Sequence, residues 1–175
     1  MCIRDRRSTD LDASANDSLL TRKRESDGIE FELAGRITDN WEVFSGVSFI
    51  NAKILEASPT AANTDAVGQM PRNTPRRTAN LWTTYNIGWG FKVGGGVEYK
   101  SERSAFVPSR GYNPNFVPSY VRWDAMVAYE QPKYTVKFNV QNLFDKVYYD
   151  ALYDNGGFTV PGQARRFILS TEYKF

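Results

Sequence analysis

Apolar and polar side chains alternate residue by residue over most of this chain, and this period of two is the feature that most constrains its fold. In the clearest segment, residues 121–130, the odd positions are all apolar and the even positions are largely polar. Successive side chains of a strand point to opposite faces, so this segment predicts a strand with one apolar face. The pattern recurs from Gly28 to the last residue and predicts about seven long strands.

The phase of the alternation predicts how neighbouring strands pair, because a slip of one residue would move every apolar side chain to the wrong face. Short loops at 38–40, 87–89 and 131–132 keep the apolar faces of three hairpins together. The pairs that these loops predict are Ile29 with Phe49, Phe31 with Val47, Tyr85 with Phe91, Trp82 with Gly94, Tyr129 with Tyr134, and Val127 with Val136.

The connections between the expected strands alternate between short and long. Short turns follow residues 37, 87 and 130, whereas long irregular segments cover roughly 55–73, 101–118 and 144–163. No run approaches the roughly 18 apolar residues of a membrane-spanning helix. Long strands with short turns on one rim and long loops on the other are typical of a β-barrel of the bacterial outer membrane.

Composition argues against several other functions. Histidine is absent and Cys2 is the only cysteine, so we expect no metal site, no cofactor and no redox chemistry. No nucleophile has a partnered base in the sequence, and we expect no enzymatic activity. Lys and Arg number 22 against 20 Asp and Glu, a balance that gives nucleic-acid binding little support.

Two groups of side chains fit a barrel but leave other interpretations open. Aromatic residues beside the short turns predict an interfacial girdle, although the core of a soluble β-sandwich would also use them. They are Trp41, Trp89, Tyr129 and Tyr134. Charged residues on the inward face predict either an ion-pair lattice or a transport path. They are Arg122, Asp124, Lys137, Arg166, Glu172 and Lys174.

Four stretches together resemble the C-terminal part of the barrel in TonB-dependent siderophore receptors. They are 28–41, 70–85, 139–149 with its Asn-Leu-Phe-Asp-Lys run at 142–146, and 161–175 with its Pro-Gly-Gln-Ala-Arg-Arg start. The resemblance implies an all-β, antiparallel transmembrane barrel of about 22 strands with a plugged lumen, of which this chain supplies about seven consecutive long strands. It also implies import of ferric siderophores across the outer membrane by active transport.

The resemblance suggests partners as well as a cargo. We expect a ferric siderophore as ligand, the TonB complex through a missing N-terminal part, the barrel assembly machinery, and outer-membrane lipid. Cationic and aromatic loop residues suit an anionic, aromatic iron chelate. The ligand-binding candidates are Arg103, Arg110, Tyr112, Tyr148, Tyr149 and Tyr153. The terminal aromatic pair Tyr173 and Phe175 resembles the barrel-assembly signal of outer-membrane proteins.

We expect residues 1–6 to be a non-native start, 7–27 to be a loop or partial strand of the barrel, and 28–175 to be the C-terminal barrel part. Two other functions remain open at this point. The receptor could carry another nutrient, such as cobalamin or a carbohydrate. The chain could also be a small structural or adhesion barrel, although an odd number of strands below eight does not match a complete bacterial barrel.

Overall fold

The computed structural model describes residues 6–8, 22–56, 67–104, 116–152 and 158–175, and strands are the only regular elements in these ranges. In chain order they are β1 (Arg6–Ser8), β2 (Arg22–Thr38), β3 (Trp41–Glu56), β4 (Arg77–Gly88), β5 (Phe91–Lys100), β6 (Arg103–Ser104), β7 (Phe116–Val117), β8 (Tyr120–Glu130), β9 (Tyr134–Gln141), β10 (Tyr149–Leu152), β11 (Thr159–Pro161) and β12 (Arg166–Tyr173). The described residues include no helix with the length and hydropathy that crossing a membrane requires.

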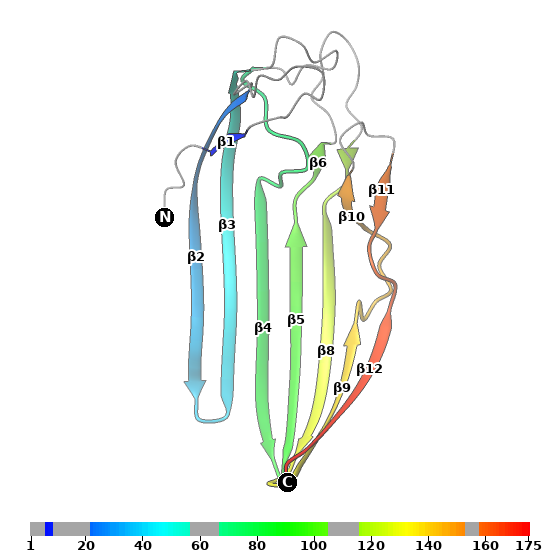
Figure 1. Ribbon diagram of the computed structural model, residues 1–175. Helices are drawn as coiled ribbons and strands as arrows, with labels where there is room; N and C mark the ends of the chain where they lie inside the picture. The colour runs from blue at the N-terminus through cyan, green and yellow to red at the C-terminus, as the bar shows by residue number, and fades with distance from the viewer. Residues whose placement is uncertain (1–5, 9–21, 57–66, 105–115, 153–157) are drawn as a thin grey trace.

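One antiparallel sheet holds all of the long strands, side by side in a curved layer (Figure 1). Its order is β1-β2-β3-β4-β5-β8-β9-β12, so strands that follow one another along the chain are neighbours in space, with only short elements between some of them. The seven long strands run from 8 to 17 residues, which confirms the predicted series of about seven. The first of them begins at Arg22 rather than at Gly28.

The two ends of the sheet differ in their connections (Figure 1). The tight turns β2–β3, β4–β5 and β8–β9 lie at one end together with the C-terminus, which we call the turn end. The small sheets β6–β7 and β10–β11 lie at the other, which we call the loop end. The predicted separation of short turns from long connections is therefore confirmed.

The register of the first hairpin follows the prediction. Ile29 pairs with Phe49 and Phe31 pairs with Val47. Only the last pair differs: a bulge between Arg36 and Thr38 pairs Trp41 with Thr38 rather than with Ile37, so the turn is shorter than the predicted loop 38–40.

The predicted register of the second hairpin is wrong by two residues. Tyr85 pairs with Val93 rather than Phe91, and Trp82 meets Gly96 rather than Gly94. A bulge follows Asn86, and the residues after it, Gly88, Trp89 and Gly90, all have left-handed φ angles, of 101°, 51° and 86°. A shift of two residues leaves every side chain on its predicted face, so the alternation alone could not detect it.

The third hairpin shows the same kind of error. Tyr129 pairs with Val136, not Tyr134, and Val127 pairs with Phe138, not Val136. The pairing of Glu130 with Thr135 makes the connection longer than the predicted two-residue turn. The Gln131 N–H donates to the Tyr134 carbonyl at 2.8 Å and closes this connection.

The two faces of the sheet have opposite character. On the outward face, apolar side chains line up in rows, for example Leu81, Val97 and Trp123 on three adjacent strands. Many are exposed, with Leu33 at 63% and Leu169 at 68%. No second sheet of the described residues covers this face, as a soluble sandwich would require. An apolar face of this extent calls for a non-aqueous surrounding such as lipid.

Candidate functional site

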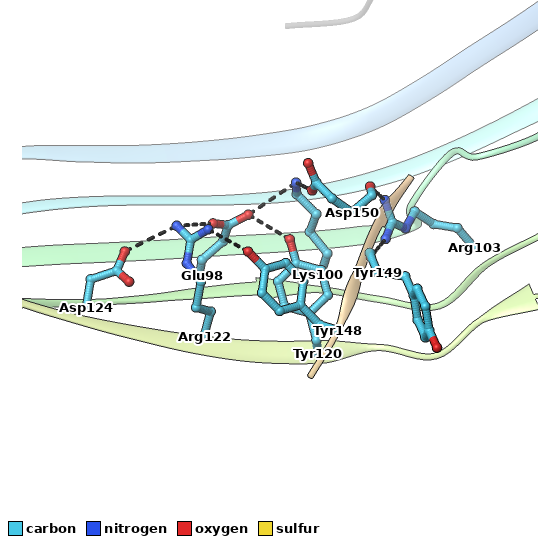
Figure 2. A network of polar contacts seen from close by, with 9 residues as sticks. All are labelled: Glu98, Lys100, Arg103, Tyr120, Arg122, Asp124, Tyr148, Tyr149 and Asp150. Carbon is cyan, nitrogen blue, oxygen red and sulfur yellow. Dashed lines mark hydrogen bonds and ion pairs between the residues drawn. The ribbon is translucent and has the colours of Figure 1, made fainter. Parts of the chain in front are cut away.

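Polar side chains gather on the inward face near the loop end (Figure 2). Lys100 pairs with Tyr120 across β5 and β8, and Glu98 pairs with Arg122 one step toward the turn end. Because positions two apart on a strand share a face, all of these side chains point inward together. The network defined by Glu98, Lys100, Arg103, Tyr120, Arg122, Asp124, Tyr148, Tyr149 and Asp150 is called the loop-end network below.

Arg122 is the centre of the network. Its Nη2 lies 2.8 Å from Glu98 Oε2 and 3.2 Å from Asp124 Oδ2, and its Nη1 donates to the Tyr148 hydroxyl at 3.2 Å. Arg122 and its two carboxylate partners are only about one-quarter exposed. In such partly buried surroundings screening by solvent is weak, so the guanidinium is held by its partners rather than by water.

Lys100 connects β5 of the large sheet to β10. Its Nζ lies 3.2 Å from Glu98 Oε1 and 3.3 Å from Asp150 Oδ1. The Tyr120 hydroxyl donates to the same Glu98 oxygen at 3.0 Å. Glu98 therefore contacts Lys100, Tyr120 and Arg122 at once, and its negative charge holds these three side chains together on the inward face.

Arg103 attaches β6 to β10 through the backbone. Its guanidinium donates to the carbonyl of Tyr149 at 2.7 Å and to that of Asp150 at 2.5 Å. The residue is only 4% exposed. Val117 of β7 and Leu152 of β10 are buried together beside this contact, so a small apolar cluster and a charged anchor hold the two small sheets to one another.

Tyr148 and Asn142 fix the segment that leads from β9 into β10. The rings of Tyr148 and Tyr120 lie 4.4 Å apart, and Tyr148 is buried. The Asn142 side-chain amide donates to the carbonyls of Lys146 and Gln163, both at 2.9 Å, while its Oδ1 accepts from the Lys146 N–H at 2.8 Å. One buried side chain thus closes the Asn142–Lys146 turn and ties it to the chain entering β12.

The loop-end network contains half of the predicted ligand-binding residues. Arg103 and Tyr148 are buried in it, while Tyr149 is 37% exposed. The others, Arg110, Tyr112 and Tyr153, lie outside the described residues. At the turn end, the rings of Tyr173 and Phe175 make an edge contact at 5.2 Å and both are exposed.

Sequence reasoning missed Glu98, Lys100, Tyr120, Asp150 and Asn142. The alternation alone could have placed Glu98 and Lys100 on the inward face with Arg122, because they occupy equivalent positions of a neighbouring strand. The sequence predicted that the inward charged residues form either an ion-pair lattice or a transport path. Two of them, Arg122 and Asp124, form ion pairs, as in a lattice. The described residues hold no group of three or more His, Cys, Asp or Glu side chains placed to bind a metal ion.

The arrangement suits binding and positioning. Its charged groups are paired with one another or with carbonyls, and the Tyr120 hydroxyl donates to Glu98, whose charge is already shared with Lys100 and Arg122. The Tyr149 ring is exposed and points away from the ion pairs (Figure 2), while its carbonyl is held by Arg103, so this side chain offers stacking and hydrogen bonding to a ligand.

Comparison with known proteins gives consistent results. A family model described as "TonB dependent receptor-like, beta-barrel" matches residues 3–143. The chain is 32% identical over 155 residues to the "Probable TonB-dependent receptor BfrD" of Bordetella pertussis, covering 85% of this chain and 20% of that protein. It is 32% identical over 157 residues to the "Probable TonB-dependent siderophore receptor PiuA" of Acinetobacter baumannii, with the same coverages.

The fold agrees with these sequence matches. The crystal structure of the siderophore receptor PiuA from Acinetobacter baumannii superimposes with a TM-score of 0.76 at 28% identity, over 88% of this chain and 22% of that one. The chain therefore spans about one-fifth of the length of these relatives.

Proposed function

Because the chain belongs to the TonB-dependent receptor-like β-barrel family, we propose that the protein of which it forms part captures ferric siderophores at the cell surface and imports them across the outer membrane. Members of this family are barrels of the outer membrane, and the chain is a section of such a wall. Its apolar outward face meets lipid, its polar inward face lines the lumen, and its loop end lies outside the cell. No bond of the cargo is made or broken in this proposal.

The observation that supports the proposal most is the loop-end network itself. It holds the segment that carries Tyr149 from three sides, because Arg103 donates to the Tyr149 carbonyl, Lys100 to Asp150, and Arg122 to the Tyr148 hydroxyl. A rigid aromatic contact suits a chelate with aromatic iron-binding groups. The relative PiuA, whose name describes a siderophore receptor, has the same fold over this region.

Under this proposal the candidate ligand residues have two roles. Tyr149 contacts the chelate, together with Arg110, Tyr112 and Tyr153, which lie outside the described residues. Arg103 and Tyr148 hold the segment that carries Tyr149, because the two terminal nitrogens of Arg103 and the Tyr148 hydroxyl already have partners within the protein. Active transport further requires the TonB complex, which acts through a part of the receptor outside this chain, and insertion requires the assembly machinery, which reads Tyr173 and Phe175.

Growth under iron limitation tests the proposal. A strain that lacks the complete receptor is supplied with single ferric siderophores, and loss of growth on one of them, restored by the wild-type gene, identifies the cargo. Tyr149→Ala is expected to raise the concentration of that chelate needed for half-maximal growth about tenfold, as loss of one aromatic contact predicts. Tyr85→Ala, on the outward face, is the control and leaves it unchanged. Unimpaired growth on every chelate, with a defect on cobalamin or a carbohydrate instead, would contradict the siderophore assignment.

A further inference from the structure

A groove opens on the outward face of the sheet near the loop end. It has a volume of about 420 Å³, and the side chains of Val121, Trp123, Phe144 and Lys146 line it. The groove exists because β8 continues to Tyr120 while its pairing with β9 stops at Ala125. Beyond that pair, the Leu143 N–H donates to the Trp123 carbonyl at 2.7 Å, and this hydrogen bond closes the groove on the side of the turn end.

The wall of this outward groove is aromatic. The rings of Trp123 and Phe144 lie 6.4 Å apart in an edge arrangement. They are 47% and 70% exposed, although each is large and apolar. Both rings belong to the face that meets lipid, so lipid acyl chains surround the groove. Contact between an acyl chain and these rings is more favourable than contact between water and the rings.

One cation lines this groove, and a second lies on the neighbouring segment. Lys146 lines it directly, and the Arg165 guanidinium lies 5.9 Å over the ring of Phe167 on the adjacent outward face. The Asn142 amide brings their two segments together by bonding to the carbonyls of Lys146 and Gln163. Asp145, between them, accepts the backbone N–H of Arg165 at 2.8 Å. Two cations against one carboxylate leave the edge positive.

We propose that this groove binds an anionic lipid of the surrounding leaflet. One acyl chain lies along Trp123 and Phe144, and the phosphate of the headgroup contacts Lys146 and Arg165. Basic side chains just beyond an apolar transmembrane surface are placed to meet lipid phosphates, and their apolar stems can lie along the aromatic wall. The site requires that the strands span a membrane but not that the cargo is a siderophore, so it goes beyond the proposed transport function.

Lipid retention by the complete receptor tests the site. The receptor is embedded in nanodiscs of phosphatidylcholine with increasing phosphatidylglycerol, and native mass spectrometry counts the anionic lipids that stay bound. The double variant Lys146→Gln/Arg165→Gln is expected to bind phosphatidylglycerol about 30-fold more weakly, as two headgroup contacts predict. Lys133→Gln/Lys174→Gln removes the same charge at the turn end and leaves this binding unchanged. In the site variant the backbone bonds of Lys146 and Arg165 remain, so folding is preserved.

A second variant separates the groove from simple attraction of charge. Phe144→Ser, at a largely exposed ring, is expected to lower retention of phosphatidylglycerol but not to change the binding of free inorganic phosphate. Equal retention by the wild type and the double variant would overturn the proposal. So would retention that Phe144→Ser leaves intact, or wild-type binding of inorganic phosphate as strong as that of the lipid. None of these outcomes depends on uptake of iron, so failure here and failure of the transport proposal are distinguishable.

Discussion

Asn142 is predicted to be the residue on which the order of the loop end most depends. It is 1% exposed, and its side chain makes three hydrogen bonds, to the N–H and carbonyl of Lys146 and to the carbonyl of Gln163. Its φ of 51° is left-handed, a conformation that asparagine tolerates better than most residues. Two separate contributions, hydrogen bonding and backbone conformation, therefore depend on one side chain.

The two contributions can be measured separately. Asn142→Gly keeps the left-handed backbone and removes three hydrogen bonds, each of which contributes roughly 1 kcal/mol, for a loss of about 3 kcal/mol. Asn142→Ala loses the same bonds and adds about 1 kcal/mol for a Cβ in the left-handed region. The alanine variant is therefore expected to be the more damaging, although alanine is the commoner substitution.

Hydrogen exchange of the complete receptor in detergent measures these losses. The Arg165 amide bonds to Asp145 and the Gly162 amide bonds to Tyr148, so neither loses its own partner when Asn142 is replaced. Faster exchange at these amides therefore measures the opening of the segment that Asn142 holds. A loss of about 3 kcal/mol predicts exchange roughly 150-fold faster at both amides in Asn142→Gly. Asn139→Ser, on β9, serves as the control. Exchange that changes less than about threefold, or a glycine variant worse than the alanine variant, would refute the reasoning.

Two further predictions concern the wall. A Cβ at Gly96 would overlap the Trp82 ring and approach the Leu81 carbonyl, whereas one at Gly35 would meet nothing within 4 Å. Gly96→Val is therefore expected to reduce the amount of heat-resistant folded barrel on gels severely and Gly35→Val hardly at all, and equal yields would show that this contact does not limit packing. Arg122→Met leaves Glu98 and Asp124 facing one another without their shared cation, and we expect about 2 kcal/mol of destabilisation. Urea denaturation measures that loss, and an unchanged midpoint would contradict the assigned role of the network.

The alternation determined which face each side chain occupies. Trp123 is outward and Arg122 inward, as their positions in the sequence predict, and the same parity holds in all three hairpins. The reason is local, since the direction of a side chain along a strand follows from the pleat and needs no knowledge of the neighbouring strand. The apolar face, the number of long strands and the separation of turns from loops follow from the same pattern.

In the second and third hairpins, the tertiary structure alone decided the pairing within each face. A slide of two residues preserves every side chain's face, so the choice of Gly96 over Gly94 as the partner of Trp82 depended on a bulge and a left-handed turn after Asn86. The same holds for the loop-end network. Arg122 meets Tyr148 only because a buried Asn142 folds the chain after β9 back against the wall. Contacts between segments that return from a loop depend on where that loop goes, and no periodicity along a strand carries that information.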